Sequence, residues 1–144
     1  MPDTSSPLRR ALLPLLALTA GVLGMSAIWT TAAILSRSPL AWLAFLAALD
    51  MVLLLRLTGM RPGPLRGMAA TAGTALCIAL SYWLIAATQF GAVLGLRPLE
   101  SAARMGPTLA SELTRLQAGP YDTALLALSL LTALLGAWGP LRQR

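Results

Sequence analysis

The residue with the greatest chemical potential is Asp50, which stands in the apolar run ALDMVLLL. If this run crosses a membrane as a helix, a carboxylate near its middle costs about 2.5–3.5 kcal/mol on insertion scales, and such residues usually face a bundle interior and serve a function. Two interpretations stay open. Asp50 could handle protons or cations, or its protonated form could hydrogen-bond a neighbouring helix and fix the packing. Hydroxyl groups at a similar depth belong to Thr19, Thr74, Ser81 and Thr132.

Three further polar side chains lie in the longest apolar stretch of the chain, and with Asp50 they complete the set of intramembrane polar candidates. They are Ser81, Tyr82 and Gln89. Tyr82 lies mid-segment and could border a pocket, whereas Gln89 could line a polar cleft or bond the backbone of a neighbour. More often, aromatic side chains at such positions belong to the bundle core or face lipid, and for Gln89 the bond to a neighbouring backbone is the simpler interpretation.

Familiar enzyme and metal chemistries find no support in the residue types. The chain has no His and one Cys, Cys77, which excludes most zinc, haem and copper sites as well as His-dependent triads. It also lacks the GxSxG, P-loop, HExxH and CxxC patterns. We therefore expect a protein without enzymatic activity, cofactor or bound metal.

Small side chains recur at helical spacing in the same long segment. Ala69, Gly73 and Cys77 stand four residues apart, and Gly91 and Gly95 form a GxxxG motif further along. Such stripes let two membrane helices approach closely. Packing within the chain is the simpler interpretation, and packing between subunits is the alternative.

Composition points to a lipid environment. Of 144 residues, 57% are hydrophobic and 11% are charged, whereas soluble domains carry about 25% charged residues. All 11 basic residues are Arg, and they lie singly or in pairs at the ends of apolar runs. Because they form no basic patch with interleaved aromatics, we expect no nucleic-acid partner.

Four apolar segments follow one another along the chain, and each approaches or exceeds the roughly 20 residues that span a bilayer as a helix. The sequence thus predicts an all-α integral membrane protein with four transmembrane helices in an up-down bundle. The predicted spans are 11–35, 39–57, 68–96 and 121–139 in one domain, 11–139, between a polar N-terminal tail, 1–10, and a basic C-terminal tail, 140–144.

The connections between these segments differ in character. Residues 58–67 form a basic loop rich in Pro and Gly, which we expect to be non-helical throughout. The longer connection, 97–120, contains a short amphipathic helical segment that lies on the membrane surface or caps the bundle. Within it, Glu100 and Arg104 are predicted to pair at i,i+4, and Gly106-Pro107 should break the helix.

Orientation follows from the distribution of Arg. With both termini in the cytoplasm, seven Arg residues face inward and four face outward. Arg56, near the end of the second segment, is expected to extend toward the cytoplasmic head groups. The abundance of Arg, Ala, Leu and Gly suggests a GC-rich bacterial genome. We therefore predict a multi-pass protein of the bacterial cytoplasmic (inner) membrane with cytoplasmic N- and C-termini.

Two functions fit these features. The first is a non-catalytic accessory or assembly subunit of a larger membrane complex, with the lipid bilayer and a membrane-protein partner or a homo-oligomer as its surroundings. The alternative is a small oligomeric transporter or channel for a proton, ion or small solute that uses Asp50. An aqueous pathway through the bundle would favour transport, and a dry interior with an exposed apolar groove would favour the subunit.

Overall fold

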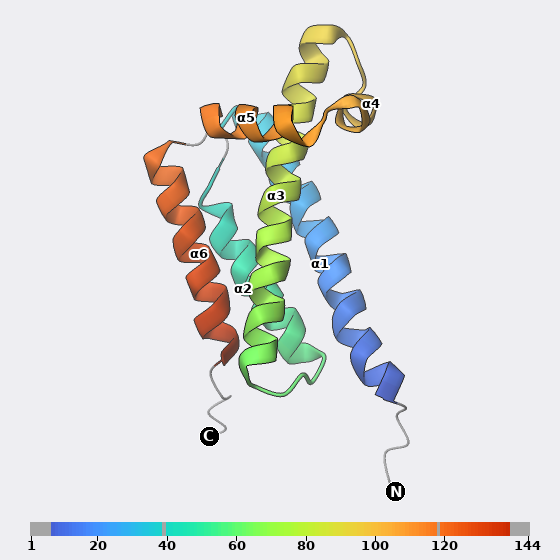
Figure 1. Ribbon diagram of the computed structural model, residues 1–144, viewed down its shortest axis with the longest axis vertical. Helices are drawn as coiled ribbons and strands as arrows, with labels where there is room; N and C mark the ends of the chain where they lie inside the picture. The colour runs from blue at the N-terminus through green and yellow to red at the C-terminus, as the bar shows by residue number, and fades with distance from the viewer. Residues whose placement is uncertain (1–6, 39, 118, 139–144) are drawn as a thin grey trace, which may run out of the picture.

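The computed structural model describes residues 7–38, 40–117 and 119–138, and every regular element in them is helical (Figure 1). The prediction of an all-α chain is confirmed. The predicted C-terminal tail, 140–144, and most of the N-terminal tail lie outside the described residues. The six helices are α1 (Pro7–Ser36), α2 (Leu43–Leu57), α3 (Pro64–Leu94), α4 (Pro98–Arg104), α5 (Pro107–Gln117) and α6 (Pro120–Trp138).

Three helices of the described chain are long and apolar enough to cross a membrane. They contribute the spans Leu12–Ser36, Pro64–Leu94 and Pro120–Ala137. This is the pattern of a multi-pass membrane protein. The fourth predicted span, 39–57, is not confirmed, because α2 has 15 residues and is therefore only about 22 Å long, against roughly 30 Å of hydrocarbon.

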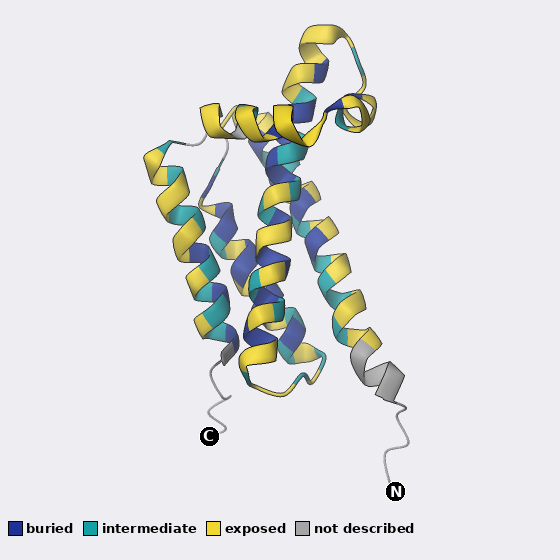
Figure 2. Ribbon diagram, in the orientation of Figure 1, coloured by how far each residue is buried: buried dark blue, intermediate teal, exposed yellow. Residues whose placement is uncertain are grey.

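Helices α2 and α3 form the centre of the bundle. Each packs against the other and against both α1 and α6, while α3 also carries α4 and α5 at its far end. Buried residues line the sides of the helices that face one another, and exposed residues cover the outside (Figure 2). Many of the exposed residues are large and apolar, including Leu16, Ile28, Leu76 and Leu135. Lipid tolerates such a surface and water does not.

Two helices begin earlier than the sequence predicts. Helix α3 starts at Pro64 rather than at residue 68, so the predicted loop 58–67 is helical over its last four residues. Helix α1 starts at Pro7, inside the predicted N-terminal tail. The physical reason is the same in both cases, because a Pro at the first helical position has its φ angle preset and lacks only an N–H that would have no partner there.

The carboxyl end of α6 is held by two arginines from other helices. Arg56 Nη2 donates to the Gly136 carbonyl at 2.6 Å, and Arg66 Nε donates to the Ala137 carbonyl at 2.7 Å. Arg66 also donates from Nη1 to Met60 O at 3.2 Å and is only 2% exposed. These bonds satisfy carbonyls that a helix end leaves unpaired. Arg56 therefore binds within the protein instead of extending to the head groups as expected.

Helix α5 crosses the end of the bundle beside α3 (Figure 1). Ala110, together with Met105 from the preceding turn, packs against Ala86 and Ala87 of α3. Leu116 remains 83% exposed, so part of the apolar face of this amphipathic helix is left for lipid. The predicted pair in α4 is confirmed, with Arg104 Nη2 at 2.8 Å from Glu100 Oε1.

Candidate functional site

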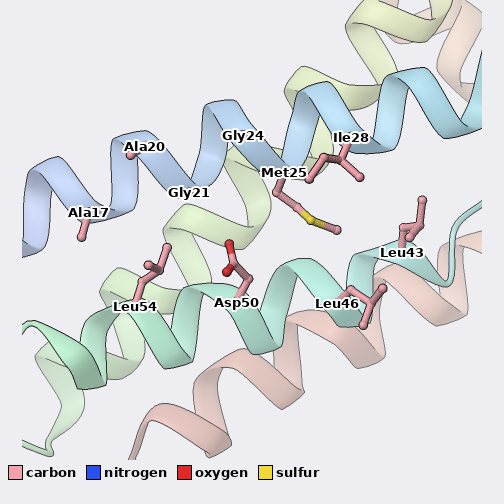
Figure 3. A pocket seen from close by; sticks show the side chains of 10 residues that line it. All are labelled: Ala17, Ala20, Gly21, Gly24, Met25, Ile28, Leu43, Leu46, Asp50 and Leu54. Carbon is pink, nitrogen blue, oxygen red and sulfur yellow. The ribbon is translucent and has the colours of Figure 1, made fainter.

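Asp50 is the central residue of α2 and points toward α1 (Figure 3). The buried residues of the helix, among them Ala47, Ala48 and Met51, pack into the protein core. Asp50 is partly exposed and stands on the side that α1 covers incompletely. The carboxyl group therefore lies between two helices, near the outer surface of the bundle.

A groove of about 650 Å³ runs between α1 and α2 at this position. Among the described residues that line it, Asp50 is the one ionisable side chain, and the remainder are aliphatic, Met or Gly. The lining comprises Ala17, Ala20, Gly21, Gly24, Met25 and Ile28 from α1 and Leu43, Leu46, Asp50 and Leu54 from α2. We refer to it as the α1–α2 groove.

The wall on the α1 side is built from small residues one helical turn apart. A Cβ atom added at Gly21 would collide with Leu54 Cδ1 and would lie 3.3 Å from Asp50 Oδ2, so glycine allows the two helices to approach here. At Gly24 the same atom would meet nothing within 4 Å, because the groove is open at that level. Ala17, Gly21 and Gly24 carry the i, i+4, i+7 signal of a helix-packing face, which sequence reasoning sought only in the third segment.

The Asp50 carboxyl makes no hydrogen bond or ion pair with any of the residues that the structure describes. Each hydroxyl of similar depth donates to a carbonyl of its own helix instead, at 2.7–2.9 Å, as in the bond from Thr74 to Ala70 O. The same holds for Thr19, Ser81 and Thr132. Arg56, six residues further along α2, is bound to α6. The carboxyl thus reaches the groove without a counter-charge from the described part of the chain.

The other polar candidates belong to α3 and do not line the α1–α2 groove. Ser81 is fully buried and donates to Cys77 O at 2.7 Å. Tyr82 is 3% exposed and makes an edge contact with Trp29, with 5.9 Å between ring centroids, and its buried hydroxyl has no hydrogen-bond partner in the described chain. Gln89 is exposed, about 12 Å further along α3 than Ser81 at 1.5 Å per residue. In the described chain, no hydrogen bond joins any of these three groups to Asp50.

The small residues of α3 pack within the chain. At Gly73, an added Cβ would lie 3.0 Å from Leu18 Cδ2 and 3.2 Å from Met51 Sδ. Cys77 is buried, and the Ser26 hydroxyl of α1 lies 3.5 Å from its sulfur. Ala69 is half-buried beside the core of α2, α3 and α6.

The two glycines near the end of α3 serve different purposes. Gly91 admits α4, because an added Cβ would lie 3.0 Å from Ser101 Cβ. Gly95 ends α3 with a left-handed φ of 68°, which favours glycine. It is therefore a helix stop rather than the second half of a packing motif.

The described residues contain no group of three or more His, Cys, Asp or Glu side chains that could hold a metal ion. Comparison of the chain with protein-family models, curated proteins and solved structures finds no match. Function is therefore inferred from the geometry of the bundle and its groove.

Proposed function

We propose that this protein is a non-catalytic accessory or assembly subunit of a larger membrane complex, and that the α1–α2 groove is the surface that receives a partner. One observation carries the proposal. An ionisable side chain at the middle of α2 opens into an apolar groove on the outside of the bundle and has no partner among the described residues. An uncompensated charge in lipid is costly, so a surface of this kind is suited to being covered.

The interior of the bundle supports a subunit better than a transporter. Most of the buried serine and threonine hydroxyls between the two ends of the described bundle donate to backbone carbonyls, whereas the buried hydroxyls of Thr30 and Tyr82 have no hydrogen-bond partner there. Thr74 and Ser81 donate within α3, Ser129 donates to Leu126 O, and Ser26 reaches Cys77 O from α1 at 3.4 Å. Hydroxyls used in this way supply no continuous path for ions or water.

For the topology, we propose that α2 crosses the membrane together with α1, α3 and α6, giving four spans. Arg56, Arg61 and Arg66 then lie at the same end of the bundle as the start of α1 and the end of α6, while α4 and α5 lie at the other (Figure 1). The positive-inside rule makes the first end cytoplasmic in a bacterial inner membrane. A reporter that is active only in the cytoplasm, inserted at Gly106, should be silent, and strong activity would contradict this orientation.

The proposed function is tested by purifying the tagged protein from its native membrane in a mild detergent and measuring intact complexes by mass spectrometry. A foreign membrane protein at fixed stoichiometry is the expected result. A homogeneous monomer or homo-oligomer would overturn the proposal and favour the transporter. In that case, proton or cation flux through vesicles reconstituted with the wild type and with Asp50→Asn would be the next measurement.

A further inference from the structure

We infer that the α1–α2 groove binds one transmembrane helix of a partner protein, and that this helix carries an Arg or Lys side chain at the level of Asp50. The inference rests on the proposed function, because it specifies the partner class for the same groove. It follows from the dimensions of the groove, its chemistry and the positions of the other charges in the chain.

The groove has the dimensions of a helix seat. On each side its lining covers twelve residues, from Ala17 to Ile28 on α1 and from Leu43 to Leu54 on α2, which corresponds to about 16 Å, or three helical turns. It runs along both helices and does not enter the core. A chain segment lying here must satisfy its own backbone hydrogen bonds, because the walls are almost entirely apolar, and a helix does so. Gly24 of α1, where an added Cβ would meet nothing within 4 Å, leaves room for such a helix to approach closely.

Charge determines the chemistry of the occupant. The Asp50 carboxyl faces the groove, and its described neighbours supply neither a hydrogen bond nor a positive charge. A basic side chain on the incoming helix would neutralise the carboxylate in a medium of low dielectric constant, where opposite charges attract strongly. A phospholipid head group cannot supply this charge, because head groups lie at the membrane surface and Asp50 lies halfway along α2.

The described residues of a second copy of this chain offer no counter-charge at this depth either. The described arginines lie near helix ends or in the connecting segments, and Arg56 and Arg66 are bound to α6. The closest of them in sequence to Asp50 is Arg56, about 9 Å further along α2. Docking the same groove of another copy would bring two Asp50 carboxyls together, which repel each other when ionised. The occupant is therefore a different protein.

The first part of the test identifies what occupies the groove. A photo-cross-linking amino acid replaces Leu46, which is exposed and lines the groove, and a matched variant carries it at Leu76, which is exposed on α3 beside α1. Both are irradiated in native membranes, and the linked peptides are sequenced. We expect a membrane-spanning peptide with a mid-span Arg or Lys from the Leu46 variant and not from the Leu76 variant. A peptide without such a residue, a second copy of this chain, or lipid alone would overturn the inference.

The second part tests the ion pair. Asp50→Asn should reduce the co-purified partner at least tenfold, whereas Asp50→Glu should retain most of it. Asp50→Lys should abolish binding, and changing the partner's basic residue to Asp should restore it. Protection of the buried Cys77 thiol from alkylation verifies that each variant is folded. Full retention of the partner by Asp50→Asn would overturn the ion pair and leave the proposed function standing, whereas the absence of any partner from the wild type would overturn both.

Discussion

Replacing Arg66 with Met tests whether this arginine holds α6 in place. Methionine keeps much of the aliphatic packing and removes the bonds to Ala137 O and Met60 O. Hydrogen bonds to charged groups contribute about 1.5–3 kcal/mol each, and an unpaired buried carbonyl costs about 1–3 kcal/mol. The wild-type guanidinium, at 2% exposed, pays a desolvation cost that the variant avoids. The lost bonds and the unpaired carbonyl destabilise the variant, and the avoided desolvation offsets part of this. We therefore expect a loss of about 3 kcal/mol in the free energy of unfolding.

The chain carries its own reporter for this measurement. Cys77 is the single cysteine of the sequence and is fully buried, so a maleimide reaches it only in opened molecules. When opening and closing are faster than labelling, the labelling rate follows the open fraction. In mixed micelles where global unfolding dominates, a loss of about 3 kcal/mol should therefore speed labelling roughly a hundredfold.

The matched control is Arg61→Met. Arg61 is exposed on the loop that precedes α3, and its loss should change stability by less than about 0.5 kcal/mol. If Arg66→Met labels within twofold of the wild type while Arg61→Met does the same, Arg66 does not stabilise α6 and the reasoning fails.

The same assay tests three other features. Gly73→Val should lower the free energy of unfolding by about 1–3 kcal/mol, because its Cβ would lie 3.0 Å from Leu18 Cδ2. Gly24→Ala should leave the stability unchanged, and equal stability of the two variants would contradict the observed packing. Tyr82→Phe should be neutral or stabilising, since it removes a buried hydroxyl that has no partner in the described chain, and a marked loss would indicate an unseen partner. Asp122→Ala should cost about 0.5–2 kcal/mol, because Asp122 Oδ2 accepts an N–H at the start of α6, and no change would exclude a capping role.

The positions of the helices could be predicted because they depend on local signals. Apolar runs located α1, α2, α3 and α6, and the predicted break at Gly106-Pro107 lies where the structure separates α4 from α5. The predicted third span ends at residue 96, two residues beyond Leu94, which is the last residue of α3. The start of α3 was missed because the sequence 58–67 was interpreted as one loop, although Pro64 is a favourable first residue of a helix.

The contacts of the arginines could not be predicted in the same way. Arg66 binds a carbonyl that lies 71 residues away in the sequence, and no local pattern reports such a pairing. The direction of Asp50 was equally hidden. Because α2 is apolar on nearly all sides, its sequence has no polar face to show which way the helix is turned. The small residues of α1 indicate the direction of Asp50, since glycine at position 21 marks the face of α1 that α2 approaches.

The short length of α2 links assembly of the protein to the thickness of the membrane around it. If α2 crosses the bilayer, its length of about 22 Å falls roughly 8 Å short of the hydrocarbon thickness, and the lipid beside it must thin or tilt to meet it. The α2 flank of the α1–α2 groove is exposed to this hydrophobic mismatch until another helix covers it. Covering the groove would release the deformed lipid, so occupation should become more favourable as the acyl chains of the membrane lengthen. Bilayer thickness would then act as a control on assembly, separate from the charge on Asp50.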